Sequence, residues 1–323
     1  MSRLLKAFFF KISKDITFRI TLIIGGGVAI LSVLLFFLLD QLIDLEGVRL
    51  LTGHGMLITA FSPAQNYGIA IPINVVSFIV LEFTQGTIRN KIIAGHSKFK
   101  IYASLYISGL ILAASLLFIY VGTLTLFGTI FGGFDVNVAT MLGSSGMGAY
   151  ATTEYIIKFV IHALLAYTTI VSYAVFIATA FRSMGPSIPL VFVAIFGLYF
   201  IGMIYGSMVI GIERAEWQSC SNAIEELAKE PGNELAISAI EENMAEMKPT
   251  YDTMLTVENI LKCVDPLYSV SYTETYMVGV GDNTKTFATI DNLGFYGGIA
   301  SNLAYSAAFF FGGACLFKKR DVK

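Results

Sequence analysis

Apolar residues in this chain gather into long runs that carry little or no charge. The first run, residues 20–39, holds twenty residues without an Asp, Glu, Lys or Arg. As a helix it would be about 30 Å long, the thickness of the hydrocarbon core of a bilayer. Five more runs follow, at residues 61–80, 101–131, 155–181, 188–212 and 293–317. The pattern predicts an all-α membrane protein with six transmembrane helices.

The second run is the least regular of the six because it contains prolines and amides. These residues are Pro63, Gln65, Asn66, Pro72 and Asn74. We expect a kinked or broken helix here. Within a bilayer such a break persists only where protein or a water-filled cavity satisfies the backbone. Gln65, Asn66 and Asn74 are therefore candidates for lining a path, and a distorted packing helix is the alternative.

The distribution of charges between the runs predicts the orientation of the chain in a membrane. Lys and Arg collect before the first run, between the second and third, between the fourth and fifth, and after the sixth, whereas the intervening loops are acidic. By the positive-inside rule both termini are cytoplasmic, and the even number of spans is supported independently of hydropathy. We expect a multi-pass protein of the cell membrane. Residues 2–18 also match an amphipathic helix in the cytoplasmic interface, with lysines near anionic headgroups.

One long polar segment, residues 213–292, separates the last two runs. It holds fifteen acidic and five basic residues, a balance of −10. Residues 215–229 and 234–247 match two short helices, and a β-branched, aromatic stretch after Pro266 matches a strand or hairpin. We expect a small α+β extracytoplasmic loop domain at 213–292, between a membrane domain at 1–212 and a sixth span with its tail at 293–323. The acidity of residues 213–292 suits either binding of cationic peptides or a solvated surface. Cys220 and Cys263 fall in this segment and are a possible disulfide or two free thiols.

Catalytic and metal-binding motifs do not occur in the sequence. There is no G-x-x-x-x-G-K-[ST] phosphate loop, no H-E-x-x-H and no C-x-x-C. Only 14% of residues are charged, and no basic face large enough to follow a nucleic acid is visible. The spans carry few carboxylates, which argues against a proton-driven carrier. We therefore expect a non-catalytic chain with neither a metal site nor a nucleic-acid partner.

A short basic turn between the second and third runs carries the most specific signal. It reads LEFTQGTIRNKIIAGHSKFKIY over residues 81–102. Thr87 or Ser97 can cap a helix start, and Gly86 and Gly95 permit turns. A polar element fixed between two helices is suited to docking on a cytoplasmic protein and transmitting its motion. The plainer alternative is a loop anchored at the headgroups.

This turn resembles the membrane subunits of ATP-binding-cassette exporters, in particular the permeases that handle bacteriocins, lantibiotics and drugs. The resemblance lies in Glu82 at the end of the second run, in GTIRN at 86–90, in SKFKIY at 97–102 and in the tail FKKRDVK at 317–323. The six spans and the N-terminal helix agree with it. The segment before the sixth span is longer than in many members, so the resemblance does not indicate the cargo.

The resemblance implies the permease subunit of an ATP-driven exporter of peptides, drugs or lipid-like compounds. Two permease chains, identical or paralogous, would pair with two cytoplasmic ATPase subunits, which bind ATP and Mg²⁺ in place of this chain. The segment 82–100 would couple the two, with Arg89, Asn90 and Lys91 facing the ATPase. The coupling residues implied are Glu82, Gly86, Thr87, Arg89, Asn90, Lys91, Ser97 and Lys98. The alternatives are a sensor or immunity protein whose exterior loop binds a peptide, and an ATP-independent carrier or channel.

Overall fold

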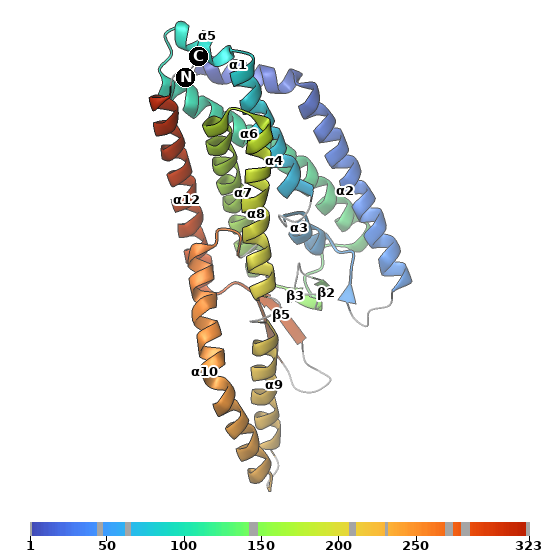
Figure 1. Ribbon diagram of the computed structural model, residues 1–323. Helices are drawn as coiled ribbons and strands as arrows, with labels where there is room; N and C mark the ends of the chain where they lie inside the picture. The colour runs from blue at the N-terminus through green and yellow to red at the C-terminus, as the bar shows by residue number, and fades with distance from the viewer. Residues whose placement is uncertain are drawn as a thin grey trace.

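The computed structural model describes residues 2–43, 48–61, 66–141, 148–206, 211–229, 232–268, 274–278 and 285–320. A bundle of long helices runs between two ends of an elongated molecule, and both termini lie at one of these ends (Figure 1). Five helices within the described residues are long and apolar enough to cross a membrane, and a bent helix pair makes a sixth. The prediction of an all-α membrane architecture is therefore confirmed, whereas the orientation of the termini stays a prediction.

The five straight spans match five of the predicted runs to within a few residues at most ends. They are α2 (Ile16–Leu42), α6 (Lys98–Gly132), α7 (Thr153–Phe181), α8 (Met184–Met203) and α12 (Asn292–Lys319). Four of them begin at a side chain that accepts a backbone N–H of the first turn. These caps are Asp15, Ser97, Thr152 and Asp291. Each satisfies a donor that the helix itself leaves unpaired.

The second predicted run is divided differently from the prediction. Residues up to Phe61 form a separate helix, α3 (Gly53–Phe61), and α4 (Asn66–Thr84) continues through Pro72 without ending there. The break comes later, at Gly86, where the chain bends by 58° into α5 (Thr87–Ile93). Gly86 has φ 67°, a conformation that glycine adopts without the cost borne by other residues.

The N-terminal segment forms α1 (Ser2–Lys14), as its apolar period predicts. Leu4, Phe8 and Ile12 form one buried stripe, since they lie four residues apart on one helix face. This stripe packs on the bundle, with Phe8 edge-on to Phe78 at 5.9 Å between ring centroids. Phe9 and Phe10 stay 60% and 65% exposed. They are the apolar residues of α1 left for a membrane interface, and that placement stays a prediction.

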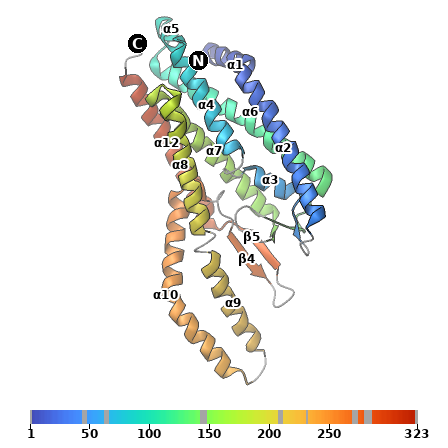
Figure 2. The same cartoon turned by 45° about the vertical axis from the view of Figure 1, so that its right-hand side comes forward.

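A small sheet lies at the end of the bundle opposite the termini (Figure 2). Its strands are β1 (Val48–Arg49), β2 (Ala139–Met141), β3 (Gly148–Ala151), β4 (Glu274–Val278) and β5 (Lys285–Thr289), in the order β1-β2-β3-β5-β4. The antiparallel pair β4–β5 is the hairpin expected after Pro266, but β5 also pairs in parallel with β3. Three loops thus share one sheet, and a separate α+β domain at 213–292 is not confirmed.

Two helices, α9 (Gly211–Leu227) and α10 (Glu234–Val264), form a hairpin that projects past the sheet, away from the termini (Figure 1). Helix α10 is about twice the predicted length because it continues through Pro249. Trp217 stacks on Tyr251 across the hairpin, with 4.6 Å between centroids and 5° between planes. The remaining exposed length of both helices is mostly polar and acidic.

Charged side chains centred on the buried Glu258 and Lys262 join the base of this hairpin to the start of α12. Glu258 is 1% exposed and receives Arg214 Nη2 at 2.6 Å and Lys262 Nζ at 3.5 Å. Lys262 Nζ also lies 3.0 Å from Oδ2 of Asp291, whose Oδ1 accepts the N–H of Gly294. We call Arg214, Glu258, Lys262 and Asp291 the Glu258 cluster. It fixes the cap of α12 to the hairpin.

Candidate functional site

Glu82 lies near the end of α4, 1% exposed, at the same end of the bundle as the termini. Its Oε1 accepts Lys11 Nζ of α1 at 2.6 Å, and its Oε2 accepts Lys91 Nζ of α5 at 2.6 Å. Thr87 Oγ1 donates to Oε2 at 2.5 Å and also lies 2.9 Å from the Glu82 carbonyl oxygen. We call Glu82, Lys11, Gln85, Thr87 and Lys91 the Glu82 cluster; Gln85 Oε1 accepts the second bond from Lys11, at 2.9 Å.

The electrostatics of this cluster favour a single arrangement of three helices. A buried carboxylate is costly unless it is paired and its lone pairs are satisfied. Here two ammonium groups and one hydroxyl satisfy it. The Lys91 ammonium also lies 3.5 Å from the centroid of the Phe8 ring, within the range of a cation–π contact. Helices α1, α4 and α5 are therefore held together at one carboxylate.

Helix α5 has an anchored side and an exposed side. Ile88 is fully buried, and Lys91 is turned toward Glu82. Arg89 and Asn90 are exposed, and Ile93 beside them is 73% exposed. A short helix that is fixed from behind and carries a guanidinium, an amide and an apolar side chain outward has the composition of a protein docking surface.

The start of α6 is tied to the end of α12. Ser97 caps α6 through the N–H of Lys100, as predicted. Lys98 Nζ donates to the carbonyl oxygens of Lys318 and Arg320, at 3.2 and 3.0 Å, and so satisfies the last turn of α12. A cation at a helix C-terminus also complements the helix dipole.

Aromatic rings link this contact back to α4. Phe317 of α12 lies 6.0 Å from the ring of Phe83 and 6.0 Å from that of Tyr102. Since Phe83 follows Glu82 directly in sequence, the end of α12 and the Glu82 cluster are adjacent.

Two predicted roles at this site need correction. Lys91 was expected to face a partner, but it faces Glu82 because the buried carboxylate needs a second cation. Thr87 does not cap α5; Gly86 occupies the cap position, and the Thr87 hydroxyl bonds to Glu82 instead. Arg89 and Asn90 are exposed, as docking residues must be.

Of the three residues predicted to line a path, the structure describes the side chain of Asn74. Gln65 lies outside the described residues, and Asn66 begins α4 with its side chain outside them. Asn74 is buried between α4 and α2: its Nδ2 donates to the Ala70 carbonyl at 2.8 Å, and its Oδ1 accepts Thr21 at 3.3 Å. Asn74 thus serves packing between two helices, which was the alternative interpretation.

The possible disulfide between Cys220 and Cys263 is not formed, and both thiols are free. The register of the hairpin gives the reason. Trp217 faces Tyr251 and Arg214 faces Glu258, so the position opposite Cys220 is near residue 249. Cys263 lies a further 14 residues along α10, about 21 Å away, far beyond the reach of a disulfide.

Sequence reasoning did not find Lys11 or Gln85 as members of the Glu82 cluster, nor Phe8 as the ring that contacts Lys91. Lys11 is separated from Glu82 by 71 residues, and nothing local to either indicates the pair. One available signal was the position of Lys11 beside the apolar stripe of α1, where a lysine is carried toward the protein surface that the stripe contacts. Among the residues that the structure describes, no group of three or more His, Cys, Asp or Glu side chains could hold a metal ion.

Comparison with known proteins gives no relative for this chain. No family model, curated protein or solved structure matches it.

Proposed function

We propose that this chain is the membrane subunit of an ATP-driven exporter, and that α5 is the surface on which a separate cytoplasmic ATPase docks. The observation that carries the proposal is the contrast between the two sides of α5. One side is fixed through Lys91 and Thr87 to the buried Glu82, and the other presents Arg89, Asn90 and Ile93 outward. The sequence resemblance at the same residues supports the proposal independently.

The attachment of α5 to α1 and α4 suits transmission of force to the helix bundle. A loose loop would absorb a displacement of its partner, whereas α5 shares one buried carboxylate with α1 and α4. A push on α5 therefore reaches two helices of the bundle. In an ATP-driven cycle the ATPase supplies the difference in affinity between bundle states, and the docking helix conveys it.

The experiment is capture of partners from the native membrane in mild detergent, with identification by mass spectrometry. We expect a stoichiometric chain that carries a phosphate-loop ATPase motif. A paired substitution, Arg89→Ala with Asn90→Ala, should abolish capture while elution volume and melting temperature stay unchanged. Lys6→Ala is the matched control, because Lys6 is exposed on α1 at the same end of the molecule and is not part of α5.

Two results would contradict the proposal. The first is no ATPase in the eluate under conditions that preserve a control transporter complex. The second is capture that the α5 substitutions leave unchanged, which would assign the binding surface elsewhere.

A sensor that binds a peptide is the second candidate, and the projecting hairpin favours it. Helices α9 and α10 extend beyond the sheet and are acidic along most of their exposed length. Replacing residues 219–249 by a short Gly/Ser turn removes the projection and keeps both the Trp217–Tyr251 stack and the Glu258 cluster. A sensor should lose its response to ligand, whereas an exporter should retain basal flux.

A further inference from the structure

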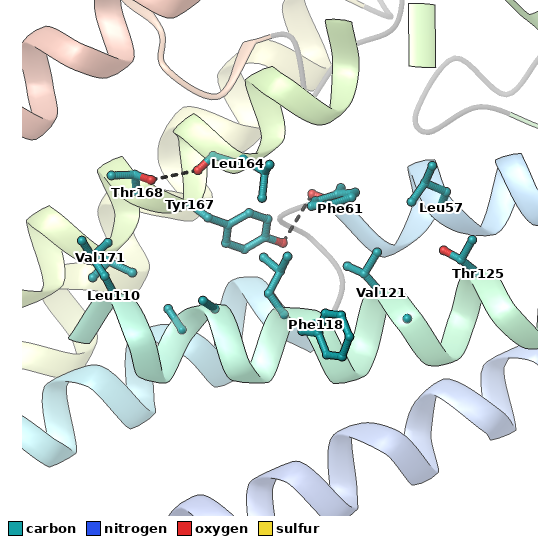
Figure 3. A pocket seen from close by; sticks show the side chains of 14 residues that line it. Leu57, Phe61, Leu110, Phe118, Val121, Thr125, Leu164, Tyr167, Thr168 and Val171 are labelled. Carbon is teal, nitrogen blue, oxygen red and sulfur yellow. Dashed lines mark hydrogen bonds between the residues drawn. The ribbon is translucent and has the colours of Figure 1, made fainter. Parts of the chain in front are cut away.

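A groove of about 610 Å³ lies between α3, α6 and α7 (Figure 3). Its floor is the face of α6 from position 110 to position 125, and its sides are α3 and α7. Phe118 and Leu164 at the groove are 78% and 48% exposed, so the groove opens on the surface that a bilayer would cover. It is separate from the Glu82 cluster, and none of the α5 residues line it.

The groove wall is apolar because its polar side chains bond to the protein itself. Thr168 Oγ1 donates to the Leu164 carbonyl at 3.0 Å, and the Tyr167 hydroxyl donates to the Phe61 carbonyl at 3.4 Å, as Figure 3 shows. Thr125 differs. Its Oγ1 is buried and makes no hydrogen bond within the described residues, whereas most hydroxyls on the spans bond to the carbonyl four residues earlier.

The groove is longer than one leaflet of a membrane and shorter than the whole hydrocarbon core. Positions 110 to 125 extend about 22 Å along α6, about three quarters of a hydrocarbon core about 30 Å thick. These positions lie along the middle of α6 (Lys98–Gly132). Thr125 lies at the end of the groove toward the sheet, where the glycerol ester of a lipid in that leaflet would lie.

The groove is too narrow to enclose a helix. A volume of about 610 Å³ over about 22 Å gives a mean cross-section of about 28 Å². A helix with side chains is at least about 10 Å wide, or roughly 80 Å² in section. An extended hydrocarbon chain is narrow enough. Small residues make the hollow: Ala113, Ala114 and Gly122 lie along the floor, and a Cβ at Gly122 would meet nothing within 4 Å.

We propose that this groove binds one hydrocarbon chain of a membrane amphiphile, which enters sideways from the leaflet on the sheet side. The Thr125 side chain, whose Oγ1 is buried in this structure, would turn toward the groove and donate to the ester or amide oxygen next to that chain. The site depends on the chain spanning a membrane and not on the ATPase. Lipid tails are as apolar as the groove, so close packing and the filling of a void favour occupancy, and the hydrophobic effect contributes little.

The test is photolabelling of the protein in nanodiscs of phosphatidylcholine and phosphatidylglycerol that contain a phospholipid with a diazirine in one acyl chain. Peptide mapping by mass spectrometry should find labels concentrated at 110–125 and 164–171 relative to the exposed face of α2. Gly122→Trp, which fills the hollow, should lower this labelling severalfold. Gly197→Trp is the matched control, because Gly197 is an exposed glycine on α8 whose Cβ would also meet nothing within 4 Å.

Further variants and readouts separate the alternatives. Gly122→Leu repeats the filling with a smaller side chain should the tryptophan variant misfold, and Thr125→Val should reduce labelling by a diazirine placed next to the ester more than by one at mid-chain. Labels spread evenly over all exposed apolar faces would mean bulk lipid only and overturn the proposal. Oxidative cross-linking between copies through Gly122→Cys, with the groove unlabelled, would assign this face to a second copy. Capture of the ATPase should be the same for Gly122→Trp and wild type, so failure here and failure of the proposed function are distinguishable.

Discussion

Replacing Glu82 by Gln tests the structural basis of the coupling proposal. The amide keeps the size of the side chain and its acceptor oxygen for Thr87, but it removes the charge that pairs with Lys11 and Lys91 at 2.6 Å each. Breaking a fully buried pair costs about 3–5 kcal/mol because a charge is left uncompensated. Lys11 and Lys91 are 31% and 17% exposed, so each can turn partly toward water. We therefore expect a smaller loss of about 2–3 kcal/mol.

The assay is thermal unfolding in detergent together with hydrogen exchange of the α5 amides. At about 2–4 °C per kcal/mol for chains of this order of size, the melting temperature should fall by about 5–10 °C. Exchange at α5 should rise more than at α7, because α5 is attached through the Glu82 cluster. Lys6→Met is the control for loss of a lysine on α1 that makes no such contact, and its effect should be within about 0.5 kcal/mol.

A double-mutant cycle then separates the two ion pairs. Lys11→Met and Glu82→Gln together should cost less than the sum of the single changes, with a coupling energy of about 0.5–3 kcal/mol, since both disrupt one pair. The reasoning is refuted if Glu82→Gln leaves both the melting temperature and the exchange of α5 unchanged. Additive costs in the cycle would mean that Lys11 acts independently of Glu82.

Three further predictions concern other parts of the fold. Burial raises the pKa of Asp265 to about 7, so between about pH 4 and 7 the folded protein keeps a proton on this carboxyl that the unfolded chain releases. The free energy of unfolding should therefore fall as pH rises from about 4 to 7, by about 4 kcal/mol in total. Melting curves recorded against pH should lose that slope in Asp265→Asn. Gly132→Ala should lower the melting temperature, because its Cβ would collide with the backbone oxygen of Leu51. Gly197→Ala is the control: its Cβ would meet open space, so thermal unfolding should show no change or a stabilisation of up to about 1 kcal/mol. Asp291→Ala should cost about 1–2 kcal/mol through loss of the α12 cap, and exchange of the first α12 amides should increase; unchanged exchange there would contradict the role of the cap.

The long elements of the fold were predictable from the sequence because they depend on local composition. Five of the six apolar runs became straight spans, since twenty or more apolar residues leave the backbone no stable alternative to a helix in lipid. The short elements were not predictable. Strand β3 pairs with its sequence neighbour β2 and also with β5, 137 residues away in the register Tyr150 to Phe287, and no local pattern records that distant partner. Helix α10 was predicted to end at residue 247, but it continues to Val264 through the exposed Pro249.

The candidate site was predictable in its location but not in its internal contacts. The basic, glycine-containing turn at 86–95 and the cap at Ser97 followed from residue chemistry alone. The sequence did not predict which lysine faces inward, because that depends on where the Glu82 carboxylate is buried. The same limit applied to the cysteines: two thiols in one polar segment suggest a bond until the register of a hairpin separates them.

Helix α12 is held at both ends by charged groups, through Asp291 at the hairpin and through Lys98 at the docking helix side. If α12 has two arrangements and the contacts at each end favour one of them, the hairpin and α5 are thermodynamically linked. If occupancy of the hairpin changes the affinity of α5 for its partner by some factor, then binding of that partner must change the affinity of the hairpin by the same factor. Measuring a ligand of the hairpin with and without the partner would therefore give the coupling free energy of the whole molecule, with no need to follow transport.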